Sequence, residues 1–90
     1  MTRQYAIFYA PRARRDLRKL PEKIATACVE FLSTALADNP YKAGKPLTSS
    51  WEGFYSARRA DWRIIYRIDD GQVLIEIVTI AHRADSYRPR

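Results

Sequence analysis

The sequence predicts a small α+β domain, in which an N-terminal αα-hairpin covers one face of an antiparallel sheet of about four strands, in the order β-α-α-β-β-β. Two observations predict this class. Apolar residues repeat at helical spacing in the first half of the chain, and β-branched and aromatic residues alternate with polar ones in the second half. With 90 residues, of which 47% are apolar, the chain can form one core but not two. We therefore expect one domain over residues 1–90.

The first strand and the first helix are expected next to each other. Residues 4–9 (QYAIFY) contain β-branched and aromatic side chains and no breaker, which is typical of a strand. Pro11 then suits the first position of a helix, where its missing N–H is not needed. Three apolar residues at i, i+4 and i+7 form a core-facing stripe: Ala13, Leu17 and Leu20.

A second helix is expected from Pro21 to about Asp38, where Asn39-Pro40 stops it. The joint between the two helices is so short that they should form an αα-hairpin. Cys28 lies on the apolar stripe of the second helix, and we interpret it as a core residue rather than a nucleophile.

The C-terminal half predicts a loop followed by three strands. Residues 39–53 contain two prolines and two glycines and should be the loop. The strands are expected at 54–60, 62–68 and 73–81, with Asp69-Asp70-Gly71 as a tight hairpin turn. The last strand is apolar on both faces for most of its length, which favours a place inside the sheet. The helices should leave the other face of the sheet partly open.

Several function classes are excluded by composition. One cysteine and one histidine cannot form an internal disulfide or an ordinary zinc site. The motifs of nucleotide-binding loops and of serine hydrolases are absent, and we expect no metal and no cofactor. No apolar run approaches the ~20 residues of a membrane span, and no signal-peptide pattern opens the chain. A soluble, cytoplasmic protein is expected.

The charge indicates an anionic partner. The net charge is +6, and twelve of the sixteen cations are arginine. A guanidinium binds phosphate with two parallel hydrogen bonds and stacks on bases, so nucleic acid or an acidic protein would fit this surface. The alternative is a basic surface that only contacts water.

Cations and one phenol gather on the three predicted strands and just after them: Arg58, Arg59, Arg63, Arg67, His82, Arg83 and Tyr87. Arginines can stabilise a dianionic phosphate transition state, and histidine or tyrosine can move protons or stack on a base. Cleavage of RNA by its own 2′-OH needs only such groups and no metal. The alternative for Arg63 and Arg67 is a solvated face or a salt bridge to Glu76.

Four segments carry a resemblance to a known family: ARRDLRKLP (13–21), GKPL (44–47), EGFYSARRADWRIIYRIDDG (52–71) and IAHRADSYR (80–88). Their order and spacing resemble those of the RelE toxins of bacterial type II toxin–antitoxin modules. The resemblance implies a small antiparallel sheet with an N-terminal helix pair, which agrees with the elements expected above. It also implies an mRNA endonuclease that enters the ribosomal A site and cuts the codon there, leaving a 2′,3′-cyclic phosphate and a 5′-OH.

The resemblance also implies roles for single residues. Arg63 and Arg83 match the family's phosphate-binding arginines, and Tyr87 matches the tyrosine that stacks on the base or orients the 2′-OH. His82 stands where some members carry a basic residue. These four are the expected catalytic residues. Four further cations are expected to bind substrate: Lys45, Arg58, Arg59 and Arg67.

The strand before Arg63 departs from the family pattern. Well-studied members carry two lysines there, and the corresponding places look like Tyr55 and Ala57. Arginine is a poor general acid or base, so proton transfer should fall to His82 or Tyr87. The alternative is that His82 only caps its strand or stacks on a base.

The implied partners are the ribosome with its mRNA and a RelB-like antitoxin, which blocks the toxin and represses the operon together with it. Operator DNA would be contacted only through the antitoxin, and no membrane is involved. We expect an acidic, partly disordered antitoxin that folds on binding along the helices or the sheet edge, and that contacts Arg12, Arg15 and Lys19. Two alternatives stay open: a ParE-like toxin that poisons DNA gyrase without nuclease activity, and a degenerate toxin that only binds its antitoxin.

Overall fold

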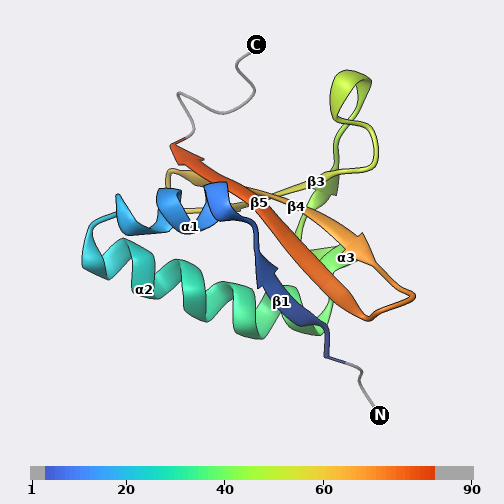
Figure 1. Cartoon of the computed structure of the whole chain (residues 1–90), viewed down its shortest axis with the longest axis horizontal. Coiled ribbons are helices and arrows are strands. Elements are labelled where there is room, and N and C mark those ends of the chain that lie inside the picture. The colour runs from blue at the N-terminus through green and yellow to red at the C-terminus, as the bar shows by residue number, and fades with distance from the viewer. Residues whose placement is uncertain (1–3, 83–90) are drawn as a thin grey trace.

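The computed structural model describes residues 4–82 and has the α+β architecture that the sequence predicts (Figure 1). In chain order the elements are β1 (Ala6–Tyr9), α1 (Pro11–Arg18), α2 (Glu22–Phe31), the π-helical turn η1 (Leu32–Leu36), α3 (Pro40–Ala43), β2 (Lys45–Pro46), the 3₁₀ turn η2 (Ser49–Trp51), β3 (Tyr55–Arg59), β4 (Trp62–Asp69) and β5 (Leu74–His82). The strand order in the sheet is β1-β5-β4-β3-β2. The last predicted strand therefore lies inside the sheet, as expected.

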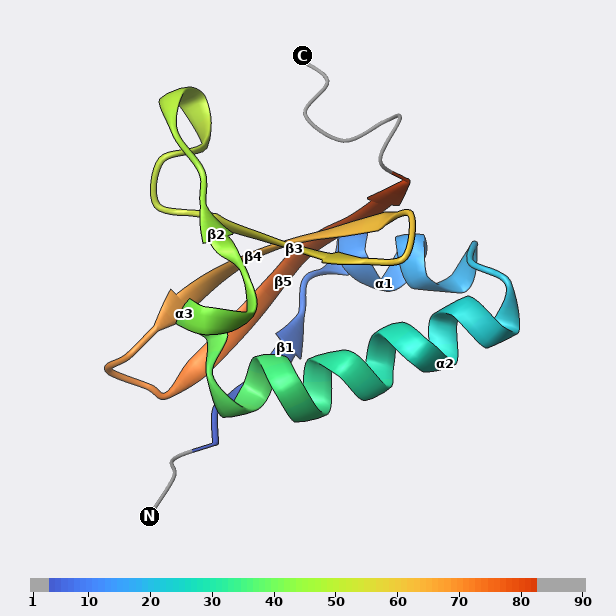
Figure 2. The same cartoon turned by 180° about the vertical axis from the view of Figure 1, so that it is seen from behind.

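The two N-terminal helices lie on one side of the sheet, and the loop between β2 and β3 projects away from them (Figures 1 and 2). The core lies between the helices and the sheet. Cys28, Leu32 and Leu36 pack there against the strand residues Ile64, Ile75 and Ile77, all fully buried. Burial raises the pKa of the Cys28 thiol, so this cysteine is a core residue and not a reactive thiolate, as predicted.

The sheet differs from the expectation in two ways. It has five strands rather than about four, and it is mixed, because β1 pairs with β5 in parallel from Ala6↔Leu74 to Tyr9↔Ile77. The other strand pairs are antiparallel, as predicted. Strands that are neighbours in sequence must be antiparallel when a tight turn joins them, whereas β1 and β5 are far apart in sequence and free of that constraint.

Helix α1 replaces β1 along the last part of β5. β1 ends at Tyr9, opposite Ile77, and the chain then turns into α1. The carboxylate of Asp16 on α1 accepts hydrogen bonds from the Ile80 backbone N–H at 3.1 Å and from the Thr79 hydroxyl at 2.6 Å. A backbone donor at the sheet edge is thus satisfied by a side chain, as buried donors require.

The second helix runs to Asp38 as expected, but its last part is a π-helical turn. Two hydroxyls bond to the backbone at this point. Ser33 Oγ donates to Val29 O at 3.0 Å, and Thr34 Oγ1 donates to Glu30 O at 2.6 Å. These carbonyls are the ones that the backbone N–H groups of the same two residues use in an α-helix, and such side-chain bonds slightly destabilise a helix.

The prediction that residues 39–53 form a loop is wrong, because this segment contains α3, β2 and η2. The Asn39 side chain accepts a hydrogen bond from Lys42 N at 3.3 Å and caps α3. The buried hydroxyl of Tyr66 donates to Pro40 O at 2.6 Å. A Cβ atom on Gly44 would lie 2.3 Å from that hydroxyl and 2.7 Å from Ser56 O, so only glycine fits there.

The turn between β4 and β5 also binds residues from two other parts of the chain. Asp69 Oδ1 accepts a hydrogen bond from Gln72 N at 3.1 Å, as a turn-forming aspartate should. The positive φ of this turn falls on Val73 (53°) and not on the glycine. Asp70 accepts hydrogen bonds from the hydroxyls of Tyr5, at 2.5 Å, and Tyr41. The bond to Asp70 raises the pKa of Tyr41 to about 12.

We expect Gly44→Ala to destabilise the protein by about 1–3 kcal/mol, because the added methyl group overlaps the Tyr66 hydroxyl and the Ser56 carbonyl. The same substitution should cost less in a Tyr66→Phe background, where the nearer of the two clashing atoms is gone. A double-mutant cycle from urea denaturation measures this coupling. Strictly additive effects would show that the two groups do not interact as described.

Candidate functional site

The open face of the sheet is set by the strand register. Residues opposite each other in an antiparallel pair share a face, and neighbours along a strand alternate. Arg58 lies opposite Arg63, and Lys45 lies opposite Ser56. Ala57 and Ile64 point into the core between them. The cations at positions 45, 58 and 63 are therefore on the face that the helices leave uncovered.

A pocket of about 460 Å³ lies at this place, and we name it the cationic pocket. Its lining residues are Lys42, Ala43, Gly44, Lys45, Ser56, Ala57, Arg58 and Arg63. Four of these eight residues are cations and none is a carboxylate. Arg63 is half-buried and its Nε atom is fully buried, so the base of its guanidinium is part of the pocket wall. Two arginines directly opposite each other repel, and an anion between them would attract both.

The cationic pocket therefore suits a phosphate group. Arginine offers a planar set of donors and lysine a point charge, and together they can surround non-bridging phosphate oxygens. The pocket residues come from α3, β2, β3 and β4, so the phosphate would lie across the sheet near its β2 edge.

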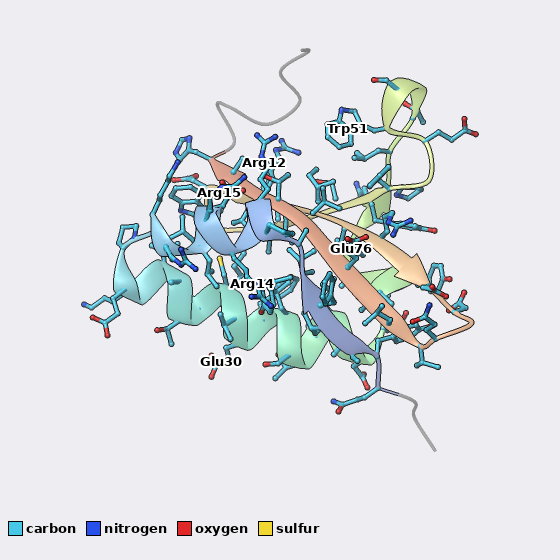
Figure 3. All side chains as sticks on the ribbon, in the orientation of Figure 1. Arg12, Arg14, Arg15, Glu30, Trp51 and Glu76 are labelled. Carbon is cyan, nitrogen blue, oxygen red and sulfur yellow. The ribbon has the colours of Figure 1, made fainter. Side chains whose placement is uncertain are left out.

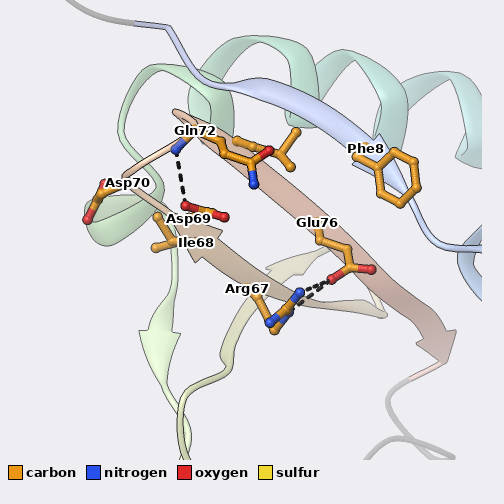
Figure 4. A pocket seen from close by; sticks show the side chains of 8 residues that line it. Phe8, Arg67, Ile68, Asp69, Asp70, Gln72 and Glu76 are labelled. Atoms are coloured by element: carbon orange, nitrogen blue, oxygen red, sulfur yellow. Dashed lines mark hydrogen bonds and ion pairs between the residues drawn. The ribbon is translucent and has the colours of Figure 1, made fainter.

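Arg67 lies outside this group. Its Nε and Nη2 atoms donate to Glu76 Oε1 at 2.9 and 2.6 Å, which is the salt bridge considered as the alternative from the sequence (Figure 4). Arg67 and Glu76 line a second pocket of about 410 Å³, which is separate from the cationic pocket. Phe8, which is 47% exposed, lines this second pocket as well. A guanidinium already held by a carboxylate has fewer donors for a phosphate, so Arg67 is a weak substrate-binding candidate.

Arg59 and His82 point to the other face of the sheet. Both lie opposite Trp62 in the register, and Trp62 is the neighbour of Arg63 along β4. The His82 and Trp62 rings meet edge to face, with centroids 5.2 Å apart. The structure thus does not bring Arg59 or His82 together with Arg63. The His82 contact with Trp62 favours the alternative in which His82 packs at the end of its strand.

Tyr55 and Ala57, the positions that seemed to replace the family lysines, both face the core. The Tyr55 ring stacks on that of Tyr66 with centroids 5.7 Å apart, and Ala57 is 2% exposed. The residues of this strand that reach the cationic pocket are Ser56 and Arg58. Ser56 was not among the residues predicted from the sequence. The alternation of Ser56, Ala57 and Arg58 could have indicated it, because an apolar residue between two polar ones in a strand faces the core while its neighbours face outward.

Sequence reasoning also missed Lys42 and Gly44, since both lie in the segment interpreted as a loop. Two predicted catalytic residues, Arg83 and Tyr87, lie outside the described residues. Within residues 4–82 no group of acidic, histidine and cysteine side chains could hold a metal ion. Over the same range no helix is long and apolar enough to cross a membrane.

The surface of α1 is strongly basic. Arg12, Arg15 and Lys19 are exposed, and none of the three forms a salt bridge within residues 4–82. Figure 3 shows Arg12 and Arg15 projecting from the outer side of this helix. This places the predicted partner surface where a partner can reach it.

Comparisons with known proteins agree on one family. A family model described as the ParE toxin of the type II toxin–antitoxin system parDE matches residues 7–87. Toxin RelE of Mycobacterium tuberculosis is 52% identical over 84 residues, which are 93% of this chain and 87% of that protein. Toxin RelG of the same organism is 45% identical over 84 residues, or 93% and 97% of the two chains.

A solved structure agrees with this. The crystal structure of the toxin–antitoxin complex RelBE2 from Mycobacterium tuberculosis contains a chain that matches with a TM-score of 0.86. The sequence identity is 44%, and the match covers 91% of this chain and 94% of that chain.

Proposed function

Since this chain belongs to the family of ParE toxins of type II toxin–antitoxin systems, we propose that it is a RelE-like endoribonuclease that cuts mRNA codons in the ribosomal A site. The relatives named RelE and RelG, at 52% and 45% identity, confirm the resemblance seen in the sequence. The observation that carries the nuclease proposal is the cationic pocket on the open face of the sheet.

In the proposed reaction the 2′-OH of one nucleotide attacks the adjacent phosphorus, and the 5′-oxygen of the next nucleotide leaves. Negative charge grows on the two non-bridging oxygens during attack. Arg63, which lines the pocket, and Arg58 opposite it would stabilise this charge. From the family resemblance we propose that Arg83 is a second phosphate-binding arginine and that Tyr87 stacks on the base or orients the 2′-OH.

Dependence on the ribosome follows from what the pocket offers. Its described lining supplies charge but no aromatic surface to orient a base, and attack requires the 2′-oxygen, phosphorus and 5′-oxygen to be in line. A codon fixed in the A site would provide that alignment. Such an enzyme acts in the cytoplasm.

A RelB-like antitoxin is the proposed regulatory partner. The chain in RelBE2, which is 44% identical, was crystallised in a toxin–antitoxin complex. The exposed cations of α1 suit an acidic chain that folds on binding. Contacts with operator DNA would be made by the antitoxin.

A second candidate function has one observation in its favour. The matching family model is described as the toxin of parDE, and in such a toxin the same scaffold binds DNA gyrase without cutting RNA. The cationic pocket would then be a docking surface for an anionic partner and would need no group that transfers a proton.

The decisive experiment is primer extension on mRNA in programmed ribosomes mixed with the purified toxin. We expect cleavage within the A-site codon, products with 2′,3′-cyclic phosphate and 5′-OH ends, and little cleavage of the same RNA without ribosomes. Equal cleavage of free RNA would refute the ribosome dependence. Intact mRNA together with inhibited gyrase supercoiling would favour the second candidate.

The two arginines on the open face of β4 give a matched pair of variants. Arg63→Ala should lower the rate of cleavage by ~10²–10³, the usual loss when one fixed donor to a transition-state oxyanion is removed. Arg67→Ala should lower it by less than about tenfold, because Glu76 already engages that guanidinium. Single-turnover cleavage on programmed ribosomes measures both. A larger loss for Arg67→Ala than for Arg63→Ala would contradict the proposed site.

Association with the antitoxin should depend on the charges of α1. We expect the double variant Arg12→Glu, Arg15→Glu to associate with the cognate antitoxin about tenfold or more slowly than the parent protein at low salt. Added salt should reduce the difference between the two association rates, because it screens the charges. Stopped-flow fluorescence measures these rates. The single variants Arg12→Glu on α1 and Lys23→Glu on α2 change the net charge by the same amount, and an equal effect of these two variants would argue against α1 as the docking site.

A further inference from the structure

The proposed reaction needs a proton for the departing 5′-oxygen, and the described wall of the cationic pocket offers few groups that can give one. We propose that Lys45 is the general acid that protonates this oxygen. The inference rests on the proposed nuclease function and goes beyond it, because it assigns the proton to a residue of β2.

Lysine is the residue type in this pocket that can give up a proton. The described lining of the cationic pocket contains no carboxylate, imidazole or phenol, and its titratable groups are two lysines and two arginines. A guanidinium does not release its proton under ordinary conditions, whereas an ammonium group does. The protein has four lysines in all, and two of them, Lys42 and Lys45, line this pocket.

The two lysines of the pocket differ in their place in the fold. Lys42 lies on the four-residue helix α3. Lys45 lies in the sheet itself, opposite Ser56, and so on the same face as Arg58 and Arg63. Lys45 thus projects over the surface on which a phosphate bound by the two arginines would lie.

The backbone of Lys45 is constrained by its two neighbours in the sequence. Pro46, opposite Tyr55, restricts the backbone after it. Before it, Gly44 lies so close to Tyr66 Oη and Ser56 O that a single methyl group would overlap both. The Tyr66 hydroxyl is fixed by its bond to Pro40 O at 2.6 Å. The Lys45 backbone is therefore constrained on both sides, while its side chain is exposed to water.

The proton balance of the step closes with water. The bond between O2′ and phosphorus forms, and the bond between phosphorus and O5′ breaks. The 2′-OH proton passes to water, and the Lys45 ammonium proton passes to O5′, which leaves as a hydroxyl. Lys45, left as an amine, takes a proton from water, so that the enzyme returns to its starting state.

The test uses an A-site codon in which sulfur replaces the 5′-oxygen of the scissile bond. A thiolate is a stable leaving group without a proton, because thiols ionise near pH 8.5. On the oxygen substrate we expect Lys45→Arg, which keeps the charge, to lower single-turnover cleavage by ~10²–10⁴. On the sulfur substrate the same variant should cleave within about tenfold of the parent protein. Lys23→Arg on α2 is the matched control and should cleave both substrates as the parent protein does.

Each outcome bears on a different claim. An equal loss on both substrates would mean that Lys45 only binds the phosphate, which would overturn the proposal. If Lys42→Arg, and not Lys45→Arg, lost cleavage of the oxygen substrate and regained it on the sulfur substrate, Lys42 would be the proton donor. This result would also overturn the proposal. Failure of the parent protein to cut either substrate would refute the nuclease function itself. Circular dichroism and retained antitoxin binding identify variants that fail only because they do not fold.

Discussion

The close approach between Gly44 and Tyr66 is the contact on which the candidate site depends. The Tyr66 ring belongs to the core and stacks on Tyr55, while its hydroxyl reaches Pro40 at the start of α3. The chain passes this hydroxyl where it has no side chain, and only then can β2 pair with β3. One tyrosine in the middle of β4 thus fixes both α3 and β2, which together form one wall of the cationic pocket.

The division of the sheet into two faces decides which cations can act together. Arg58 and Arg59 are neighbours in sequence, yet the first lines the cationic pocket and the second lies opposite Trp62 on the helix side. The Arg59 charge lowers the pKa of the Cys28 thiol, against the larger effect of burial, which raises it. A count of cations along the sequence therefore overestimates how many of them can contact one ligand, because only every second residue of a strand lies on the same face of the sheet.

Much of the fold could be predicted because local pattern decides it. Helical spacing predicted the αα-hairpin, alternation predicted β4 with its core-facing residues, and the apolar character of both faces predicted that β5 lies inside the sheet. The strand β2 could not be found this way, because a two-residue strand has no periodicity and its proline and glycine neighbours are typical of a loop. The parallel pairing of β1 with β5 depends on contacts 68 residues apart, as in Ala6↔Leu74, which no local pattern records.

That parallel pairing has a consequence for synthesis of the protein. β5 is the last strand in the sequence and pairs with β1 and with β4, so the complete five-stranded sheet cannot assemble while β5 is still untranslated. Pairings between distant segments also form slowly during folding. A nascent chain that stops before β5 has the segments of its helices and of β2, β3 and β4, but it lacks the strand that joins this part of the sheet to β1. Release of the chain before β5 therefore leaves the N-terminal strand without its partner, and the sheet is closed only when the last strand has been made.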